Sequence, residues 1–167
     1  MRCSVEVSHE EWIAAPLAIV RAQFADLHHH IAAGVHPKLR FEIISLGERR
    51  ARFVQEERLL GIRQRDVFER VITVDRLGMV DTAIDGPHRD GWLSFRFTPG
   101  TRSGRDATLV TVKVSMPVPR LLGMLRPLWH AHIRRKLLVA MEEDRHDIEV
   151  RGYPRSSRHA VADGLAA

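Results

Sequence analysis

The segment ATLVTVKVSMPVPRLLGMLRPLWHAHIRRKLLVAMEEDRHDI, residues 107–148, decides the fold because a strand pattern gives way to a helix pattern within it. Residues 107–116 are predicted as a strand, which ends at Pro117 and Pro119 because proline cannot donate to a strand ladder. A long helix then covers roughly residues 120–148. At about 100° per residue, one broad and mostly apolar stripe of this helix contains Arg126, His130, Ile133, Leu137, Ala140, Met141 and Asp144. The chain is therefore expected to close with a helix that has one inward face.

Upstream of this segment the pattern predicts one strand, a short helix and a run of further strands. Residues 3–13 alternate, with Val5, Val7, His9, Glu11 and Ile13 on one face. Pro16 suits a first helical turn, so a short helix is expected over residues 17–24. After a histidine-rich segment, strands are predicted at residues 41–46, 51–60, 66–74, 80–84 and 92–97. Glycine and proline turns separate them, which favours short hairpins and an antiparallel sheet.

Length and composition are those of one globular domain. The 167 residues predict a single domain over residues 1–150 and a disordered tail over residues 151–167. Cys3 is the single cysteine, so an internal disulfide and a cysteine-ligated cluster are excluded. No apolar run approaches the roughly 20 residues that cross a bilayer, and the N-terminus has no apolar signal core. A cytoplasmic location without a membrane span is expected.

The basic balance of the chain does not predict a nucleic-acid partner. The net charge is +5 and the sequence pI is near 10.3. The arginines are spread among acidic residues, however, and no nucleic-acid-binding motif accompanies them. A G-x-S-x-G elbow, a P-loop and a dinucleotide fingerprint are also missing from the sequence.

The order of elements, together with the Ala15-Pro16 start of the first helix, resembles the START-like helix-grip superfamily (SRPBCC, polyketide cyclase-like). The resemblance implies an α+β fold, in which a curved antiparallel sheet wraps around a long C-terminal helix and two short helices follow the first strand. It also implies a deep, mostly apolar cavity between sheet and helix, and such cavities commonly hold a small molecule.

Two clusters further resemble the catalytic domain of Rieske-type non-haem iron ring-hydroxylating oxygenases. That family carries an Asp-x-x-His-x-x-x-x-His segment and acidic residues on its last helix, and Asp26-Leu-His28-His29, His36 and Asp144 are similar. The resemblance implies His29, His36 and Asp144 as metal ligands, with Asp26 behind them. Six residues separate His29 from His36 here, against four in the family, so His30 is an equal candidate. The Rieske cluster motif is absent, so electrons would come from the substrate, or from a separate reductase or ferredoxin.

The helix stripe predicts that Asp144 points inward, where a carboxylate needs a partner. That partner is either a metal ion or an arginine such as Arg52 or Arg65 on the facing sheet. His130 shares the stripe and is, with Asp26, the candidate for a catalytic or substrate-contacting role.

Two functions therefore remain open from the sequence. The first is a metal-dependent enzyme, with Fe²⁺ or Zn²⁺ held by His29 or His30, His36 and Asp144, that acts on an aromatic or apolar small molecule. The alternative is a metal-free polyketide cyclase-like protein or lipophilic ligand carrier. In that case His130, Glu57 or Asp66 would supply the polar contacts of the cavity.

Overall fold

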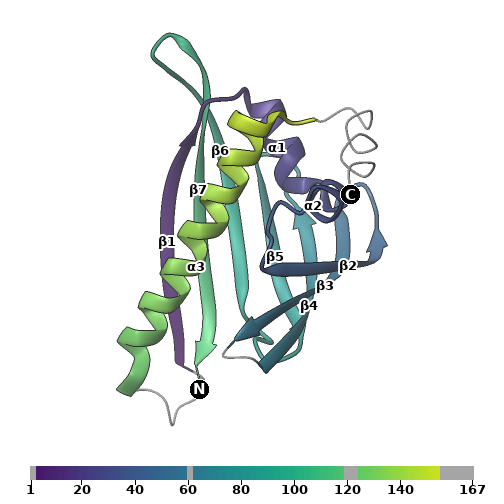
Figure 1. Cartoon of the computed structure of the whole chain (residues 1–167), viewed down its shortest axis with the longest axis vertical. Helices are drawn as coiled ribbons and strands as arrows, with labels where there is room; N and C mark the ends of the chain where they lie inside the picture. The colour runs from purple at the N-terminus through teal and green to yellow at the C-terminus, as the bar shows by residue number, and fades with distance from the viewer. Residues whose placement is uncertain (1–2, 60–61, 119–123, 155–167) are drawn as a thin grey trace, which may run out of the picture.

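The computed structural model describes residues 3–59, 62–118 and 124–154. Seven antiparallel strands form one sheet in the order β1-β7-β6-β5-β4-β3-β2, and the long helix α3 lies along it beside β1 (Figure 1). Two short helices follow the first strand. The predicted helix-grip architecture, a curved sheet with a long C-terminal helix, is confirmed.

The helices and strands have the following bounds. The strands are β1 (Cys3–Ile13), β2 (Leu39–Leu46), β3 (Arg50–Leu59), β4 (Ile62–Ile72), β5 (Gly78–Asp85), β6 (Trp92–Arg102) and β7 (Arg105–Val118). The helices are α1 (Leu17–Ala25), α2 (Leu27–Ala33), α3 (Arg126–His146) and a final π-helical segment, η2 (Asp147–Gly152). No helix among the described residues is long and apolar enough to span a membrane.

The hairpin of β6 and β7 is longer than the sequence indicated. Pro99 and Gly100 were read as a turn, but β6 runs through them to Arg102 and stays paired with β7. The pairing of β5 with β6 ends at Gly78 opposite Arg96. Pro99 therefore lies where β6 has β7 on one side only, and its missing N–H removes no ladder bond.

The C-terminal helix differs from its prediction at both ends. It begins at Arg126, and residues 120–123 of the predicted helix lie outside the described residues. At the other end α3 stops at His146, and η2 continues to Gly152, past the domain boundary expected at residue 150. Tyr153 packs against His29 with ring centroids 4.7 Å apart. The rest of the predicted tail, residues 155–167, lies outside the described residues.

The buried apolar side chains form two clusters rather than one. The first joins β1, β6 and β7 to α1 and α3, and includes Val110, Val112, Leu137 and Met141. We call the sheet face that carries these valines the inner face. The second cluster joins α2 to β3, β4 and β5 on the same face. Leu93, which is only partly buried, packs against both. The buried packing is therefore divided into two parts, and Leu93 contacts both of them.

Candidate functional site

The histidine-rich segment forms α2 and the turn that follows it. Asp26 caps the helix, because its Oδ1 accepts a hydrogen bond of 2.9 Å from the backbone N–H of His29. Gly34 ends the helix with φ of 57°, a left-handed conformation that suits glycine. This sharp end turns the chain so that His36 lies beside His30, with ring centroids 5.3 Å apart.

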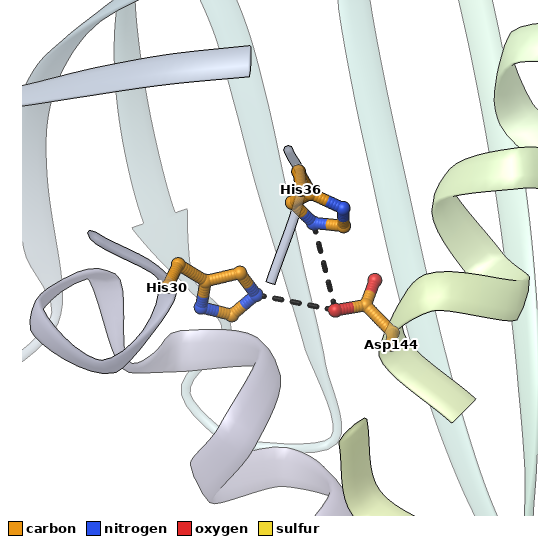
Figure 2. A group of neighbouring side chains, drawn as sticks. All are labelled: His30, His36 and Asp144. Atoms are coloured by element: carbon orange, nitrogen blue, oxygen red, sulfur yellow. Dashed lines mark hydrogen bonds and ion pairs between the residues drawn. The ribbon is translucent and has the colours of Figure 1, made fainter. Parts of the chain in front are cut away.

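Three side chains from segments far apart in the sequence converge on one point (Figure 2). Asp144 Oδ1 lies 3.2 Å from His30 Nε2 and 3.6 Å from His36 Nε2. One ligand atom from each of the three side chains lies within 4.8 Å of the other two, and all three residues are buried. Asp144 belongs to α3, while the histidines come from α2 and the turn after it, so the site forms only when these segments pack together.

The second nitrogen of each ring has a partner outside this point. His30 Nδ1 lies 2.7 Å from the backbone carbonyl oxygen of Asp26, and His36 Nδ1 lies 2.8 Å from Glu143 Oε2. A carbonyl oxygen and a carboxylate only accept hydrogen bonds, so both Nδ1 atoms must donate. The Nε2 atom of each ring is therefore the one presented to Asp144.

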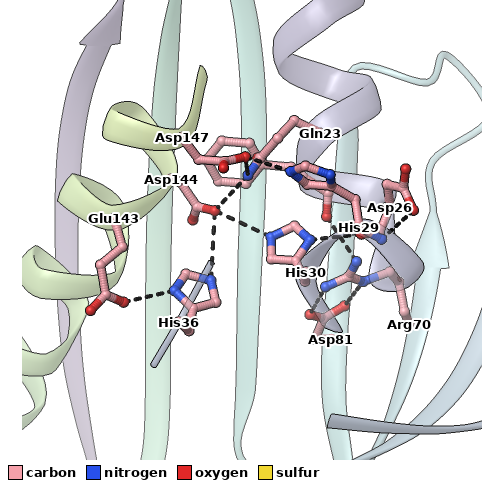
Figure 3. Close-up of polar contacts among 11 residues, drawn as sticks. Gln23, Asp26, His29, His30, His36, Arg70, Asp81, Glu143, Asp144 and Asp147 are labelled. Carbon is pink, nitrogen blue, oxygen red and sulfur yellow. Dashed lines mark hydrogen bonds and ion pairs between the residues drawn. The ribbon is translucent and has the colours of Figure 1, made fainter. Parts of the chain in front are cut away.

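A neighbouring pair connects α2 to the start of η2 (Figure 3). His29 Nε2 lies 2.6 Å from Asp147 Oδ2. The side-chain amide of Gln23 on α1 donates to both acidic residues, over 3.1 Å to Asp144 Oδ1 and 3.3 Å to Asp147 Oδ2. Two buried carboxylates are thus held side by side by an amide and two imidazoles.

The network shifts the pKa values of its central pair in opposite directions. Burial pushes the pKa of His30 down, but the hydrogen bond to Asp144 and the charge of that carboxylate outweigh it and raise the pKa above 6.5. Burial pushes the pKa of Asp144 up, and the hydrogen bond to His30, the neighbouring His36 and the amide of Gln23 outweigh it and lower the pKa below 3.8. Both shifts favour the ion pair.

The structure separates the histidines between which the sequence could not choose. His30 lies with His36 and Asp144, while His29 faces Asp147. Asp26 does not reach the point of convergence: its side chain caps α2 and accepts a 3.1 Å hydrogen bond from the hydroxyl of Tyr153. Burial, followed by the charge of Asp26, raises the pKa of that tyrosine to about 12.

The position predicted for His130 is wrong. His130 was expected to face inward with Asp144, but it is exposed on α3. The helical stripe does continue to this position, but among the residues of α3 only Leu137, Met141 and Asp144 are buried. The helical angle alone could not show which turns of the helix the sheet covers.

The arginines suggested as partners of Asp144 pair elsewhere. Arg52 binds Glu69 and Arg65 lies near Glu42 and Glu56, all on the sheet. The partners of Asp144 are His30, His36 and Gln23.

Three other network residues were missed or misjudged from the sequence. Glu143 is absent from the predicted apolar stripe of the helix, yet it is half-buried against His36. Asp147 and Gln23 were not singled out, although each had a signal. Asp147 follows Asp144 by three residues and so lies near it on the helix surface, and Gln23 stands between apolar positions of α1.

A second polar group lies further along the inner face, on strands that also carry Phe53 and Phe68. Asp66 of β4 is buried. Its Oδ1 accepts a 2.8 Å hydrogen bond from the backbone N–H of His88, and its Oδ2 lies 2.8 Å from Nδ1 of the same residue. Glu57 of β3 accepts a 2.6 Å hydrogen bond from Lys136 of α3, which links the sheet to the helix.

Two buried atoms in this region have no hydrogen-bond partner among the described residues. They are Gln64 Oε1, on the residue paired with Glu57 across the sheet, and His132 Nε2 on α3. Burial and the charge of Lys136 lower the pKa of His132, so its ring is held neutral. Unpaired buried polar atoms are uncommon and costly, and they commonly mark a place where water or a ligand binds.

Two surface hollows among the described residues are open to solvent. One, of about 350 Å³, is lined by Gly47, Glu48, Arg49, Arg50 and Val71. The other, of about 510 Å³, lies along a single face of α3 that includes His130 and Arg134. Neither is the deep space between sheet and helix that the resemblance implied.

Comparison with known proteins identifies the fold. No protein-family model and no curated protein sequence matches the chain. Among solved structures, it is similar to the ZhuI aromatase/cyclase from Streptomyces sp. R1128, with a TM-score of 0.65, 16% identity, and 90% of this chain and 99% of that one covered. A START superfamily protein from Mycobacterium smegmatis matches with a TM-score of 0.64 and 16% identity over 82% and 94% of the two chains. Norcoclaurine synthase from Thalictrum flavum, in complex with dopamine and hydroxybenzaldehyde, matches with a TM-score of 0.64 and 16% identity over 93% and 90%.

These neighbours correct the first functional expectation. A Rieske-like iron enzyme, supplied by a reductase or ferredoxin, was expected from the histidine motif. The similar structures are instead an aromatase/cyclase and a norcoclaurine synthase, which favours the cyclase-like or ligand-carrier alternative. The motif misled because its residue types and approximate spacing do not specify one reaction. The chain has the helix-grip fold of START-like, polyketide cyclase-like proteins.

Proposed function

We propose that the protein binds an aromatic or otherwise apolar small molecule between the inner face of the sheet and α3, as a cyclase-like protein or ligand carrier without redox chemistry. The observation that carries the proposal is the set of large apolar side chains that pack against the two buried clusters but stay only partly buried. They are Phe41, Ile43, Leu93, Phe95, Met116, Trp129 and Ile133. Accessible apolar surface of this kind on an inner face favours an apolar ligand.

The polar groups of the inner face would fix the orientation of that ligand. Asp66 and Glu57, both suggested by the sequence as contacts, lie on this face, whereas His130 does not. The unpaired atoms Gln64 Oε1 and His132 Nε2 add an acceptor and a ring nitrogen. A hydroxyl group on the ligand could donate to Gln64 Oε1, and a hydroxyl or carbonyl group could pair with His132 Nε2, so we expect an aromatic ligand with polar substituents.

The similar structures support this ligand class. The Thalictrum norcoclaurine synthase holds dopamine and hydroxybenzaldehyde, which are both substituted aromatic rings. The Streptomyces protein is an aromatase/cyclase. A ligand of the same chemistry suits the phenylalanine-rich inner face of this chain.

Of the two roles named above, the pairing of Asp66 with His88 favours a cyclase-like enzyme, in which His88 would transfer a proton, over a simple ligand carrier. Both hydrogen bonds of the carboxylate go to His88, which orients Nδ1 toward Asp66 and leaves Nε2 as the basic atom of the ring. A carboxylate that orients an imidazole is a common arrangement for a general base.

A titration with 2-naphthol, followed by fluorescence and calorimetry, tests the proposal. Leu93→Trp would place a larger side chain where the two clusters meet and should weaken binding at least tenfold. Ile44→Trp is the matched control, because Ile44 is 54% exposed on the edge strand β2, and it should bind as wild type. Wild type should bind 2-naphthol roughly tenfold more tightly than naphthalene, and His88→Leu should remove that preference. Equal binding by wild type and a folded Leu93→Trp variant would refute the proposed site.

A further inference from the structure

We infer that His30, His36 and Asp144 bind one divalent transition-metal ion, such as Zn²⁺, that joins α2 and its following turn to α3. This inference goes beyond the proposed function and concerns binding alone. It stands on the geometry of the three side chains and on the partners that surround them.

Both histidine rings turn Nε2 toward Asp144. Each Nδ1 donates outward, His30 to the Asp26 carbonyl and His36 to Glu143, so each neutral ring turns the lone pair of Nε2 toward Asp144. A lone pair that faces a carboxylate oxygen at 3.2 or 3.6 Å is repelled unless a positive charge lies between them. A metal ion supplies that charge directly.

Protons are the other possible source of that charge. Protonation of His30 alone would leave the Nε2 lone pair of His36 facing Asp144 Oδ1 at 3.6 Å. Protonation of both rings would bury two like charges on rings 5.3 Å apart. One divalent ion carries the same total charge at a single point and bonds both nitrogens and the carboxylate. The arrangement therefore suits a metal better than a pair of protons.

The distances to Asp144 are close to those of a metal site. Ligand atoms about 2.1 Å from a zinc ion are roughly 3.0 to 3.4 Å apart at the usual angles. The two distances to Asp144 Oδ1 are 3.2 and 3.6 Å, and all three ligand atoms lie within 4.8 Å of one another. Metal binding would draw the two histidine rings toward the ion.

The surrounding contacts are those that typically support metal ligands. An imidazole ligand commonly donates its other N–H to a carbonyl or carboxylate, and a ligand carboxylate is itself hydrogen-bonded. Here His30 has the Asp26 carbonyl, His36 has Glu143, and Asp144 accepts from the amide of Gln23. Asp144 is more than a hundred residues from both histidines in the sequence, so the ion would hold two distant segments together.

The ion would lie at the edge of the ligand-binding surface. Phe41, which is half-buried on the inner face, is close to both rings, with centroid distances of 6.5 Å to His30 and 6.1 Å to His36. The metal is nevertheless bound by the protein alone, so its binding can be measured without the small molecule.

The test is a titration of untagged, chelator-treated protein with Zn²⁺ by calorimetry and with Co²⁺ by visible absorption. Wild type should bind one ion per chain, and the Co²⁺ complex should show ligand-field bands. His36→Ala and Asp144→Asn should each weaken binding at least a hundredfold. Glu143→Gln should weaken it about 10- to 100-fold, because the support for the His36 ring is reduced. His28→Ala is the matched control, since His28 is exposed on the same helix and should leave affinity unchanged.

Far-ultraviolet circular dichroism and melting of the chelated variants show whether each remains folded, and His36→Ala decides the outcome if Asp144→Asn does not fold. Wild type without stoichiometric Zn²⁺ or Co²⁺ binding would overturn the inference, as would a folded His36→Ala variant with wild-type affinity. Failure of naphthol binding would leave this inference standing, and failure of metal binding would leave the proposed function standing.

Discussion

Replacing Arg70 with methionine should destabilise the protein strongly and also disturb the histidine segment. Arg70 and Asp81 are both buried and form two hydrogen bonds of 2.7 Å between neighbouring strands β4 and β5. Arg70 Nη1 also donates to the carbonyl of Phe24 over 2.9 Å, which fixes the end of α1 just before Asp26. The guanidinium thus connects the sheet to the start of α2.

The expected loss follows from these contacts. Removing one partner of a buried ion pair costs about 3 to 5 kcal/mol, and the lost bond to the Phe24 carbonyl adds about 1 kcal/mol. A total of about 4 to 6 kcal/mol would lower the melting temperature by roughly 8 to 24 °C in a protein of this length. Equilibrium urea unfolding at pH 7, followed by circular dichroism, measures the change.

Two further variants make the reasoning refutable. Arg70→Met combined with Asp81→Leu removes both charges and should lose less stability than Arg70→Met alone, because no buried charge remains unpaired. Arg52→Ala is the control on the neighbouring strand. Arg52 pairs with Glu69 but its side chain is 56% exposed, so its loss should cost under about 1 kcal/mol. A loss below about 1 kcal/mol in Arg70→Met, or a double variant as unstable as the single one, would contradict the ion-pair account.

Four other predictions concern the histidine site. The folded-state pKa of His30 is raised above 6.5. The stability that this residue contributes to the chelated protein is therefore present below pH 6.5 and is lost as the pH rises through the folded-state pKa. The difference in unfolding free energy between wild type and His30→Gln should shrink from pH 5.5 to pH 8.5, and a constant difference would contradict the shift. The pKa of Asp144 is lowered below 3.8, so its contribution is present above pH 3.8 and is lost as the pH falls through the folded-state value; acid titration of Asp144→Asn should therefore show a weaker loss of stability than wild type. Zn²⁺ at a hundred times its dissociation constant should stabilise the fold by about 2.7 kcal/mol, seen as a higher melting temperature that excess chelator reverses. Gly34→Ala adds a Cβ that meets no atom within 4 Å, so only the backbone strain at φ of 57° should act. The free energy of unfolding should fall by about 1 kcal/mol, and Zn²⁺ should bind more weakly. An unchanged melting temperature would show that this turn relaxes freely.

The sequence by itself determined the architecture of the sheet and the closing helix. Alternation in residues 3–13 placed Val5, Val7 and Ile13 on the buried face, and Pro16 and the Pro117 region marked the ends of elements correctly within a few residues. Such features are local, because period and turn chemistry act over a few neighbouring residues. The extension of β6 through Pro99 was missed because it depends on where β5 stops pairing, which no pattern within β6 records.

The site was decided only by the tertiary structure. The sequence indicated that Asp144 points inward and that histidines near residues 28–36 matter, but consecutive residues of α2 contact different carboxylates. His30 contacts Asp144 of α3 and His29 contacts Asp147 of η2, which follows from how α2 packs against the end of the chain. His130 shares the helical stripe with Asp144 but is exposed, because burial depends on which turns the sheet covers. Helical period sets the direction of a side chain, whereas its partner is set by packing between segments distant in the chain.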